Sequence, residues 1–220
     1  MPDWETLFSK ISWTASGSEI EAESMRRIEA ETGSSPFSGA EWRVARRIVH
    51  ASADFSLLGS LRFKDSPVDR IRAALSAGAP IFCDSNMIKA GVSIEKLKRF
   101  NSAYCRDFLL CLISDSAVAE QAAREKLSRA LLAVRKAKAS LHGAIVLVGN
   151  APLALAEVVR LRETEGIKPA AVIGMPVGFV NVVESKELLF ASDIPYVSIE
   201  GRRGGSPLAV AALHGALEVS

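Results

Sequence analysis

The stretch Ala144-Ile145-Val146-Leu147-Val148 is a continuous apolar run that ends in Gly149-Asn150. Two later apolar runs, at residues 170–173 and 196–199, also end in turns that contain glycine. A helical pattern follows each of the three runs, over residues 153–162, 183–189 and 207–217. Buried strands that alternate with helices are typical of a parallel sheet covered on both faces. We therefore predict an α/β fold with a mainly parallel sheet flanked by helices.

The first half of the chain shows mainly helical patterns. We predict helices over residues 19–30, from a cap at Ser38, over 67–77 and, as one long helix, over 116–139. Glu41 follows Ser38 at the spacing of a capping box. Two short apolar runs, residues 80–84 and 108–113, suit buried strands. No internal repeat or long linker divides the chain, so we predict a single domain over residues 1–220.

The composition is that of an ordinary globular protein, because 49% of the 220 residues are hydrophobic and 24% are charged. The net charge of +2 gives no indication of nucleic acid or of a membrane surface as partner. Three cysteines without a C-x-x-C spacing indicate free thiols in a reducing compartment. The first residues lack a basic segment before an apolar run, and no apolar stretch approaches the ~20 residues that span a bilayer. We expect a cytoplasmic protein.

Three loops that contain glycine follow the three predicted strands of the second half, at residues 149–152, 174–181 and 201–207. Ligands of open α/β sheets bind at the carboxyl ends of the strands. Glycine allows a close approach of the backbone, and helix N-termini direct free N–H groups at anions. Arg202 and Arg203 add guanidinium groups that can hold carboxylates. These features predict an anion-accepting edge, although each loop alone is equally well explained as a tight turn.

The patterns of several other kinds of site are missing. There is no G-x-G-x-x-G that opens a first βα unit and no G-x-x-x-x-G-K-[ST], which disfavours a nucleotide-dependent enzyme. There is no G-x-S-x-G, which disfavours a serine hydrolase. No pair of histidines or carboxylates has the spacing of metal ligands, so we predict no protein-bound metal.

His50 is the histidine with the most suggestive surroundings, because it ends the helix that carries Arg46 and Arg47. These arginines precede it by four and three residues and therefore lie beside it on the helix. Guanidinium groups favour a neutral imidazole until an anionic ligand screens them, and imidazole suits proton transfer near neutral pH. A helix-end histidine that satisfies terminal carbonyl groups is the more common alternative on spacing alone. We predict that His142 and His214 are structural.

Ordered blocks along nearly the whole chain carry a resemblance to a known family. The blocks are Glu21-Ala22-Glu23-Ser24 with Arg27-Ile28, Arg47-Ile48-Val49-His50-Ala51, Ala77-Gly78-Ala79-Pro80-Ile81 with Cys83-Asp84, Gly149-Asn150-Ala151-Pro152, residues 174–180, Glu184-Ser185-Lys186 and residues 201–206. In this order and spacing they resemble the precorrin-8X methylmutases, together with the methylmutases that act on cobalt-precorrin-8. The match is looser between Ser52 and Asp65, and Ser128 stands where threonine is common.

The resemblance implies an isomerase of cobalamin biosynthesis that moves a methyl group from C11 to C12 of a tetrapyrrole macrocycle. The implied substrate is precorrin-8X or cobalt-precorrin-8, and the corrinoid product is hydrogenobyrinic acid or cobyrinic acid. The sequence does not distinguish the metal-free from the cobalt-bearing pathway. The resemblance also implies a homodimer that needs no separate cofactor. A corrinoid-binding or carrier module without catalysis is the alternative, although binding alone needs no proton donor at His50.

The resemblance also implies roles for individual residues. His50 falls on the catalytic histidine, the general acid that protonates a ring nitrogen, withdraws electron density and so lowers the barrier to methyl migration. Family substrate contacts fall on Ser24, Arg47 and Arg129. The loops that contain glycine then become contacts to the acetate and propionate groups of the substrate. The contacts that we predict there are Gly149, Asn150, Gly178, Arg202, Gly204 and Ser206.

Overall fold

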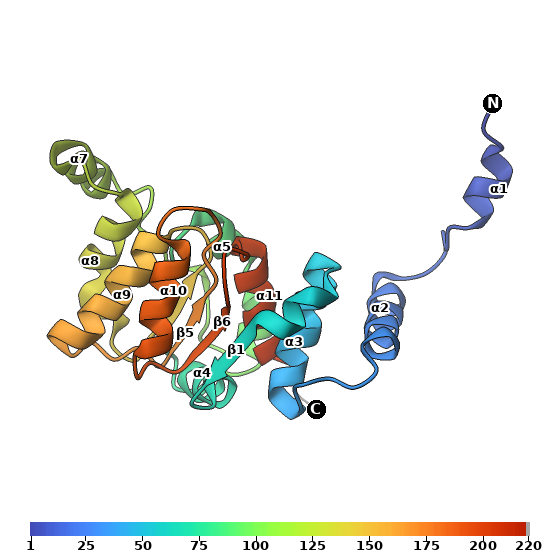
Figure 1. Cartoon of the computed structure of the whole chain (residues 1–220), viewed down its shortest axis with the longest axis horizontal. Coiled ribbons are helices and arrows are strands. Elements are labelled where there is room, and N and C mark those ends of the chain that lie inside the picture. The colour runs from blue at the N-terminus through green and yellow to red at the C-terminus, as the bar shows by residue number, and fades with distance from the viewer. Residues whose placement is uncertain (219–220) are drawn as a thin grey trace. The chain divides into compact units, whose positions relative to one another are not determined.

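The structure is a computed structural model, and it describes residues 1–218 (Figure 1). The chain divides into two compact units, an N-terminal unit of residues 1–35 and a larger unit that begins at Pro36. The sheet lies wholly in the larger unit. This division does not decide whether residues 1–220 form a single domain, which stays a prediction. No helix among the described residues is long and apolar enough to cross a membrane.

The N-terminal unit contains the helices α1 (Trp4–Ser9) and α2 (Gly17–Thr32). The hydroxyl of Ser16 accepts a hydrogen bond from the N–H of Glu19, and the N–H of Ser16 donates to the Glu19 carboxylate at 2.7 Å. This reciprocal pair is the capping box that starts α2. In residues 1–35, all of which the structure describes, Ile28 alone is buried. The unit therefore has almost no apolar core of its own.

In the described part of the chain, six strands form one sheet in the order β1-β6-β5-β4-β2-β3. The strands are β1 (Leu61–Lys64), β2 (Ile81–Cys83), β3 (Leu109–Leu110), β4 (Ile145–Val148), β5 (Ala171–Gly174) and β6 (Tyr196–Ile199). Neighbouring strands are parallel except β1 and β6, which are antiparallel. The predicted α/β fold with a mainly parallel sheet is confirmed.

Helices connect the strands of the larger unit. They are α3 (Gly39–Ser52), α4 (Pro67–Ser76), α5 (Asn86–Gly91), α6 (Ile94–Lys98), α7 (Ser116–Glu125), α8 (Arg129–Leu141), α9 (Pro152–Glu165), α10 (Val182–Ala191) and α11 (Ser206–Ala216). Short 3-10 helices cover Phe55–Ser60 and Arg106–Phe108. The helices predicted after the three apolar runs are confirmed as α9, α10 and α11.

Each face of the sheet is covered by its own set of helices (Figure 1). Along β4, Ile145 and Leu147 pack in one core with residues of α3, α4, α5 and α11. Val146 and Val148 pack in the other core, with residues of α8, α9 and α10. All four side chains are fully buried. A strand that is buried on both faces needs an apolar residue at every position, which explains the continuous apolar runs of the sequence.

The prediction of one long helix over residues 116–139 is wrong. Lys126 adopts the left-handed conformation, with a φ of 53°, and its N–H donates to the carbonyl of Ala122. This contact ends α7 at Glu125, and α8 begins at Arg129. The break gives Arg129 the first position of a helix.

Two smaller predictions are also wrong. The strand expected over residues 108–113 is only Leu109–Leu110, because the chain then turns and the N–H of Asp115 donates to the carbonyl of Leu112. Ser38 is the N-cap residue of α3, as predicted, but the expected capping box is absent because the Ser38 side chain accepts no hydrogen bond from the helix. The left-handed Gly39, with a φ of 54°, separates Ser38 from the regular turns of the helix.

Candidate active site

The order of the parallel strands identifies the edge where a ligand should bind. From β2 the chain crosses to β3 on one side, and it then continues to β4, β5 and β6 on the other side. The winding therefore reverses between β2 and β4, and ligands of such sheets bind at the carboxyl ends of the strands at this point. Asp84 directly follows β2, and Gly149 directly follows β4. These residues and the loops beside them form the candidate site.

Asp84 is a buried carboxylate, 1% exposed. It accepts hydrogen bonds from three successive N–H groups, those of Gly149 (3.2 Å), Asn150 (2.8 Å) and Ala151 (2.7 Å). Burial raises the pKa of Asp84, and the three donors oppose this rise. These N–H groups precede α9, so Asp84 already takes the place of an anion at that helix N-terminus. These three N–H groups are therefore not free for a ligand, and Gly149 and Asn150 as substrate contacts stay predictions.

The loop after β6 is held by a buried cation. Lys186 in α10 is 1% exposed, and its Nζ donates to the carbonyl oxygens of Gly201 and Arg203, each at 2.7 Å. Burial lowers the pKa of Lys186 to about 8. A Cβ atom at Gly204 would lie 2.2 Å from the carbonyl oxygen of Met175, so a side chain has no room there. The sequence contained Lys186 in a recognisable block, but it gave no indication of this contact.

The loops after β4 and β6 touch each other. A Cβ atom at Gly149 would lie 2.7 Å from the Cα of Ser206, so the two backbones are in direct contact. The hydroxyl oxygens of Ser206 and Ser85 lie 2.9 Å apart. Ser206 is buried, with 6% exposure. The predicted site residues Gly149 and Ser206 thus lie together, and the Ser206 hydroxyl forms a hydrogen bond with the Ser85 hydroxyl.

Arg202 is an exposed cation at this edge. Its guanidinium lies 5.6 Å from the centre of the Phe179 ring, and Phe179 is 84% exposed. The N–H of Gly178 donates to the carbonyl of Arg202 at 3.3 Å, which joins the loop after β5 to the loop after β6. A guanidinium over an aromatic ring offers positive charge beside a flat apolar surface. This combination suits a flat ligand that carries carboxylates.

His50 lies in the last turn of α3 and is exposed. Four residues later, Asp54 accepts a hydrogen bond from the guanidinium of Arg203 at 2.6 Å, which ties the end of α3 to the loop after β6. The helix end is closed by Ala53, whose N–H donates to the carbonyl of Val49. Within residues 1–218 the His50 imidazole has no hydrogen-bond partner, so the alternative of a histidine that caps its own helix is wrong.

The two arginines beside His50 contact a carboxylate near the other end of the chain. Glu218 accepts a hydrogen bond from Nε of Arg47 at 2.8 Å and one from Arg46 at 3.0 Å. Their side chains are mostly buried, with 14% exposure for Arg47 and 21% for Arg46. Glu218 is 171 residues from Arg47, and sequence reasoning did not identify it. Arg47 as a substrate contact stays a prediction, in which a substrate carboxylate shares the guanidinium with Glu218.

The other two histidines accept hydrogen bonds from backbone N–H groups. Nε2 of His214 accepts from Ser93 at 3.2 Å, and Nδ1 of His142 accepts from Lys168 at 3.4 Å. Burial, aided by nearby cations, lowers the pKa of His214 to about 4, so this imidazole is neutral at physiological pH. The contact of His214 agrees with its predicted structural role, whereas His142 is exposed and its structural role stays a prediction.

Arg129 and Ser24 are placed by their helices. Arg129 is the exposed first residue of α8, and α8 leads into β4 through a short turn. The helix therefore runs antiparallel to β4 and begins at the carboxyl edge of the sheet. Ser24 lies on α2 of the N-terminal unit. No interaction among the described residues tests whether Arg129 or Ser24 binds the substrate. Both roles stay predictions.

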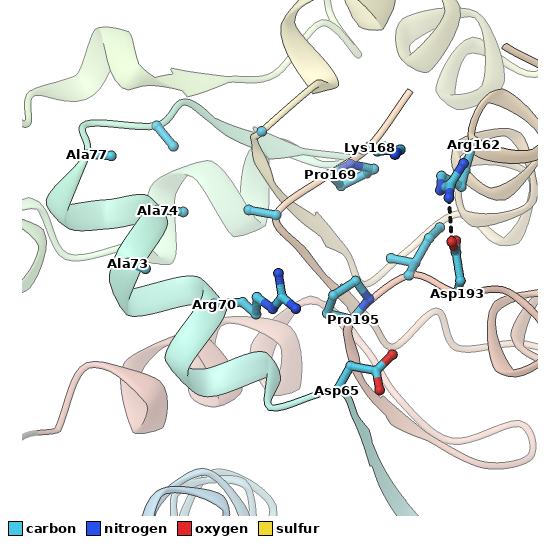
Figure 2. A pocket seen from close by; sticks show the side chains of 14 residues that line it. Asp65, Arg70, Ala73, Ala74, Ala77, Arg162, Lys168, Pro169, Asp193 and Pro195 are labelled. Atoms are coloured by element: carbon cyan, nitrogen blue, oxygen red, sulfur yellow. Dashed lines mark hydrogen bonds and ion pairs between the residues drawn. The ribbon is translucent and has the colours of Figure 1, made fainter. Parts of the chain in front are cut away.

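A cavity of about 510 Å³ lies at the opposite edge of the sheet (Figure 2). Residues just before strands line it, among them Gly143 and Ala170. Arg70 points into this cavity, while Arg162 is paired with Asp193 (Figure 2). Because ligands of such sheets bind at the carboxyl ends, this cavity is not part of the candidate site. In the part of the chain that the structure describes, no three His, Cys, Asp or Glu side chains are arranged to hold a metal.

A doubly wound sheet with a histidine, an exposed arginine and an aromatic ring near its carboxyl edge is the arrangement of an α/β enzyme for a flat anionic ligand. The family model described as precorrin-8X methylmutase matches residues 19–219. The chain belongs to this family, which consists of isomerases of cobalamin biosynthesis. The resemblance predicted from the ordered sequence blocks is confirmed.

Similar proteins match over nearly their whole length. The chain is 41% identical over 212 residues to a cobalt-precorrin-8 methylmutase of Leptospira interrogans, covering 93% of this chain and 94% of that protein. It is 34% identical over 206 residues to a precorrin-8X methylmutase of Pseudomonas aeruginosa, covering 93% and 96%. The solved structure of a precorrin-8X methyl mutase from Thermus thermophilus matches with a TM-score of 0.82 and 42% identity, over 91% of this chain and 95% of that chain.

Proposed function

We propose that the chain moves a methyl group from C11 to C12 of precorrin-8X or cobalt-precorrin-8, giving hydrogenobyrinic acid or cobyrinic acid. Similarity to methylmutases of both names supports the reaction and leaves the two substrates as alternatives. The observation that carries the mechanism is the position and exposure of His50. Its exposed imidazole lies on a helix whose end is tied, through Asp54 and Arg203, to the loop that carries Arg202.

His50 is the general acid of the proposed reaction. It donates a proton to a ring nitrogen of the macrocycle, and the protonated macrocycle withdraws electron density from the carbon that the methyl group leaves. A positioned acid of this kind accelerates a reaction by about 10²–10⁴-fold. Isomerisation leaves the composition of the substrate unchanged, so one proton leaves the macrocycle after migration and restores His50.

The acetate and propionate groups of the substrate require donors around the rim of the macrocycle. Guanidinium groups form the strongest hydrogen bonds to carboxylates, and we assign this role to Arg47, Arg129 and Arg202. Ser24 and Asn150 add uncharged polar contacts. Gly149, Gly178, Gly204 and Ser206 contribute through the shape of the loops, because their backbones are packed closely together at this edge.

We infer that the protein acts as a homodimer in the cytoplasm, with the site near the subunit interface and without a separate cofactor. Apolar side chains of the loop after β5 support the interface, because Val177, Phe179 and Val180 are 46%, 84% and 74% exposed. Light scattering during size-exclusion chromatography measures the assembly. A mass close to twice the 23.6 kDa of one chain is the expected result, and a mass of one chain would contradict it.

The reaction is tested by an ultraviolet–visible spectrum of the purified protein with precorrin-8X and with cobalt-precorrin-8 in parallel. Conversion of one precursor to the spectrum of its rearranged corrin is the expected result, and it also decides which pathway the protein serves. A shifted substrate spectrum without conversion would favour a binding or carrier module. Unchanged spectra with both precursors would refute the proposed function.

A further inference from the structure

Lys186 is a buried cation without a carboxylate partner among the described residues. Burial of an ammonium group is unfavourable unless hydrogen bonds compensate for the lost water, and here burial lowers its pKa to about 8. Its partners are two carbonyl oxygens, those of Gly201 and Arg203, each at 2.7 Å. An apolar side chain such as methionine has a similar volume and would not need this desolvation. Packing alone therefore does not account for a lysine at this position.

The two carbonyls that Lys186 holds lie on either side of Arg202 in the sequence. The Gly201 carbonyl belongs to the peptide group just before Arg202, and the Arg203 carbonyl belongs to the peptide group just after Arg203, so Lys186 anchors the backbone on both sides of Arg202. The carbonyl of Arg202 itself accepts a hydrogen bond from the N–H of Gly178 at 3.3 Å. The backbone of Arg202 is thus held on three sides, while its guanidinium stays exposed over the ring of Phe179.

We propose that Lys186 is a positioning residue for substrate binding, which holds the backbone around Arg202 so that its guanidinium meets a carboxylate of the corrin precursor. This inference rests on the proposed function, because it assigns Arg202 to that substrate. Lys186 itself does not touch the ligand, since it lies beneath the loop and is 1% exposed. A guanidinium that is already oriented loses less conformational entropy on binding than a free one.

The test is a double-mutant cycle with Lys186→Met and Arg202→Ala, measured on whichever precursor the wild-type protein converts. Lys186→Met raises KM about tenfold and changes kcat by less than about twofold, because a ground-state contact is weakened while His50 stays in place. The double variant has the KM of Arg202→Ala alone, because Lys186 acts through Arg202. Lys186→Arg, which keeps donors for the two carbonyls, restores part of the lost affinity.

Two outcomes would overturn the proposal: an unchanged KM in folded Lys186→Met, or KM increases that multiply in the double variant. Val158→Ala, a truncation of a buried residue in α9 away from this loop, controls for a general loss of stability and keeps the wild-type KM. If Lys186→Met does not fold, Lys186→Gln replaces it in the same cycle.

Hydrogen exchange of the amides in residues 201–205 gives a measurement that does not need substrate. Faster exchange in Lys186→Met than in Val158→Ala supports the positioning role, and equal exchange contradicts it. Failure of the wild-type protein to convert either precursor refutes the proposed function instead, and the exchange result then decides only whether Lys186 orders the backbone of residues 201–205.

Discussion

The loops after β4 and β6 lie in contact, yet they are held in opposite ways. The loop after β4 donates three N–H groups to a buried anion, Asp84. The loop after β6 accepts two hydrogen bonds from a buried cation, Lys186. The first arrangement uses up the N–H groups that a ligand anion would need. The second uses carbonyl groups and leaves the Arg202 guanidinium exposed.

This difference separates two roles within one glycine-rich edge. The loop after β4 is closed to external anions at its backbone, so Asn150 contributes its exposed side chain there. The loop after β6 presents positive charge, and Arg203 also ties it to the end of the His50 helix through Asp54. We therefore expect changes at the loop after β6 (the second loop) to alter substrate binding and catalysis, and changes at Asp84, which holds the backbone of the loop after β4 (the first loop), to alter mainly stability.

The largest effect is expected at His50, which lies on the helix tied to the second loop. His50→Ala lowers kcat by about 10²–10⁴-fold because the general acid is lost, and it leaves the affinity for the corrin precursor nearly unchanged. Conversion followed by absorbance, with a binding titration of the same variant, measures both. His142→Ala serves as the control with wild-type kcat, because His142 lies just before β4 and therefore at the opposite edge of the sheet. Equal kcat in the two variants would remove His50 from the mechanism.

The buried cation of the second loop predicts a dependence of stability on pH. Lys186 has a pKa of about 8 in the folded protein, against an ordinary value of 10.5. Between these values the unfolded state binds more protons, so the free energy of unfolding rises as the pH rises from about 8 to about 10.5. The rise is on the order of 3 kcal/mol. It is measured by urea unfolding of the wild type relative to Lys186→Met, and a difference that is independent of pH would contradict the prediction.

The buried anion of the first loop predicts a stability effect with little change in binding. Asp84→Asn keeps the shape of the side chain but removes the charge that three N–H groups share, and it lowers the free energy of unfolding by about 2 kcal/mol. The exposed Asp107→Asn is the matched control, with unchanged unfolding. KM stays within about twofold of wild type. A large rise in KM would mean that Asp84 also orients the substrate contact assigned to Asn150.

The sequence predicts best those parts of the fold in which every residue is buried to the same extent. Strands β4, β5 and β6 are buried on both faces, so their apolar runs are unbroken. Strand β1, with Leu61-Arg62-Phe63-Lys64, is a half-buried edge strand, and its alternation of apolar and charged residues was the overlooked signal. The break at Lys126 has no glycine or proline to mark it.

The contacts of the site are harder to predict because they join distant parts of the chain. Asp84 meets a loop that begins 65 residues later, and Glu218 meets Arg47 across 171 residues. The spacing of the glycines indicates where the backbone approaches another group closely. It does not indicate that this group is another loop of the same protein, as it is for Gly149 and Ser206. Lys186 stands in a helical stretch between Ser185 and Glu187, and only the folded chain shows which carbonyls it holds.

The smallest effect is expected at the tie between the second loop and the His50 helix. Asp54→Asn weakens an ion pair between exposed side chains, so the free energy of unfolding hardly changes. The end of α3 is then less firmly held, and kcat falls a few-fold because His50 spends less time at the ring nitrogen. Asp193→Asn breaks the pair of the exposed Asp193 with the mostly buried Arg162 at the opposite edge and keeps the wild-type kcat. The same kcat for both variants would show that the tie does not orient His50, and that the second loop acts on the substrate through Arg202 alone.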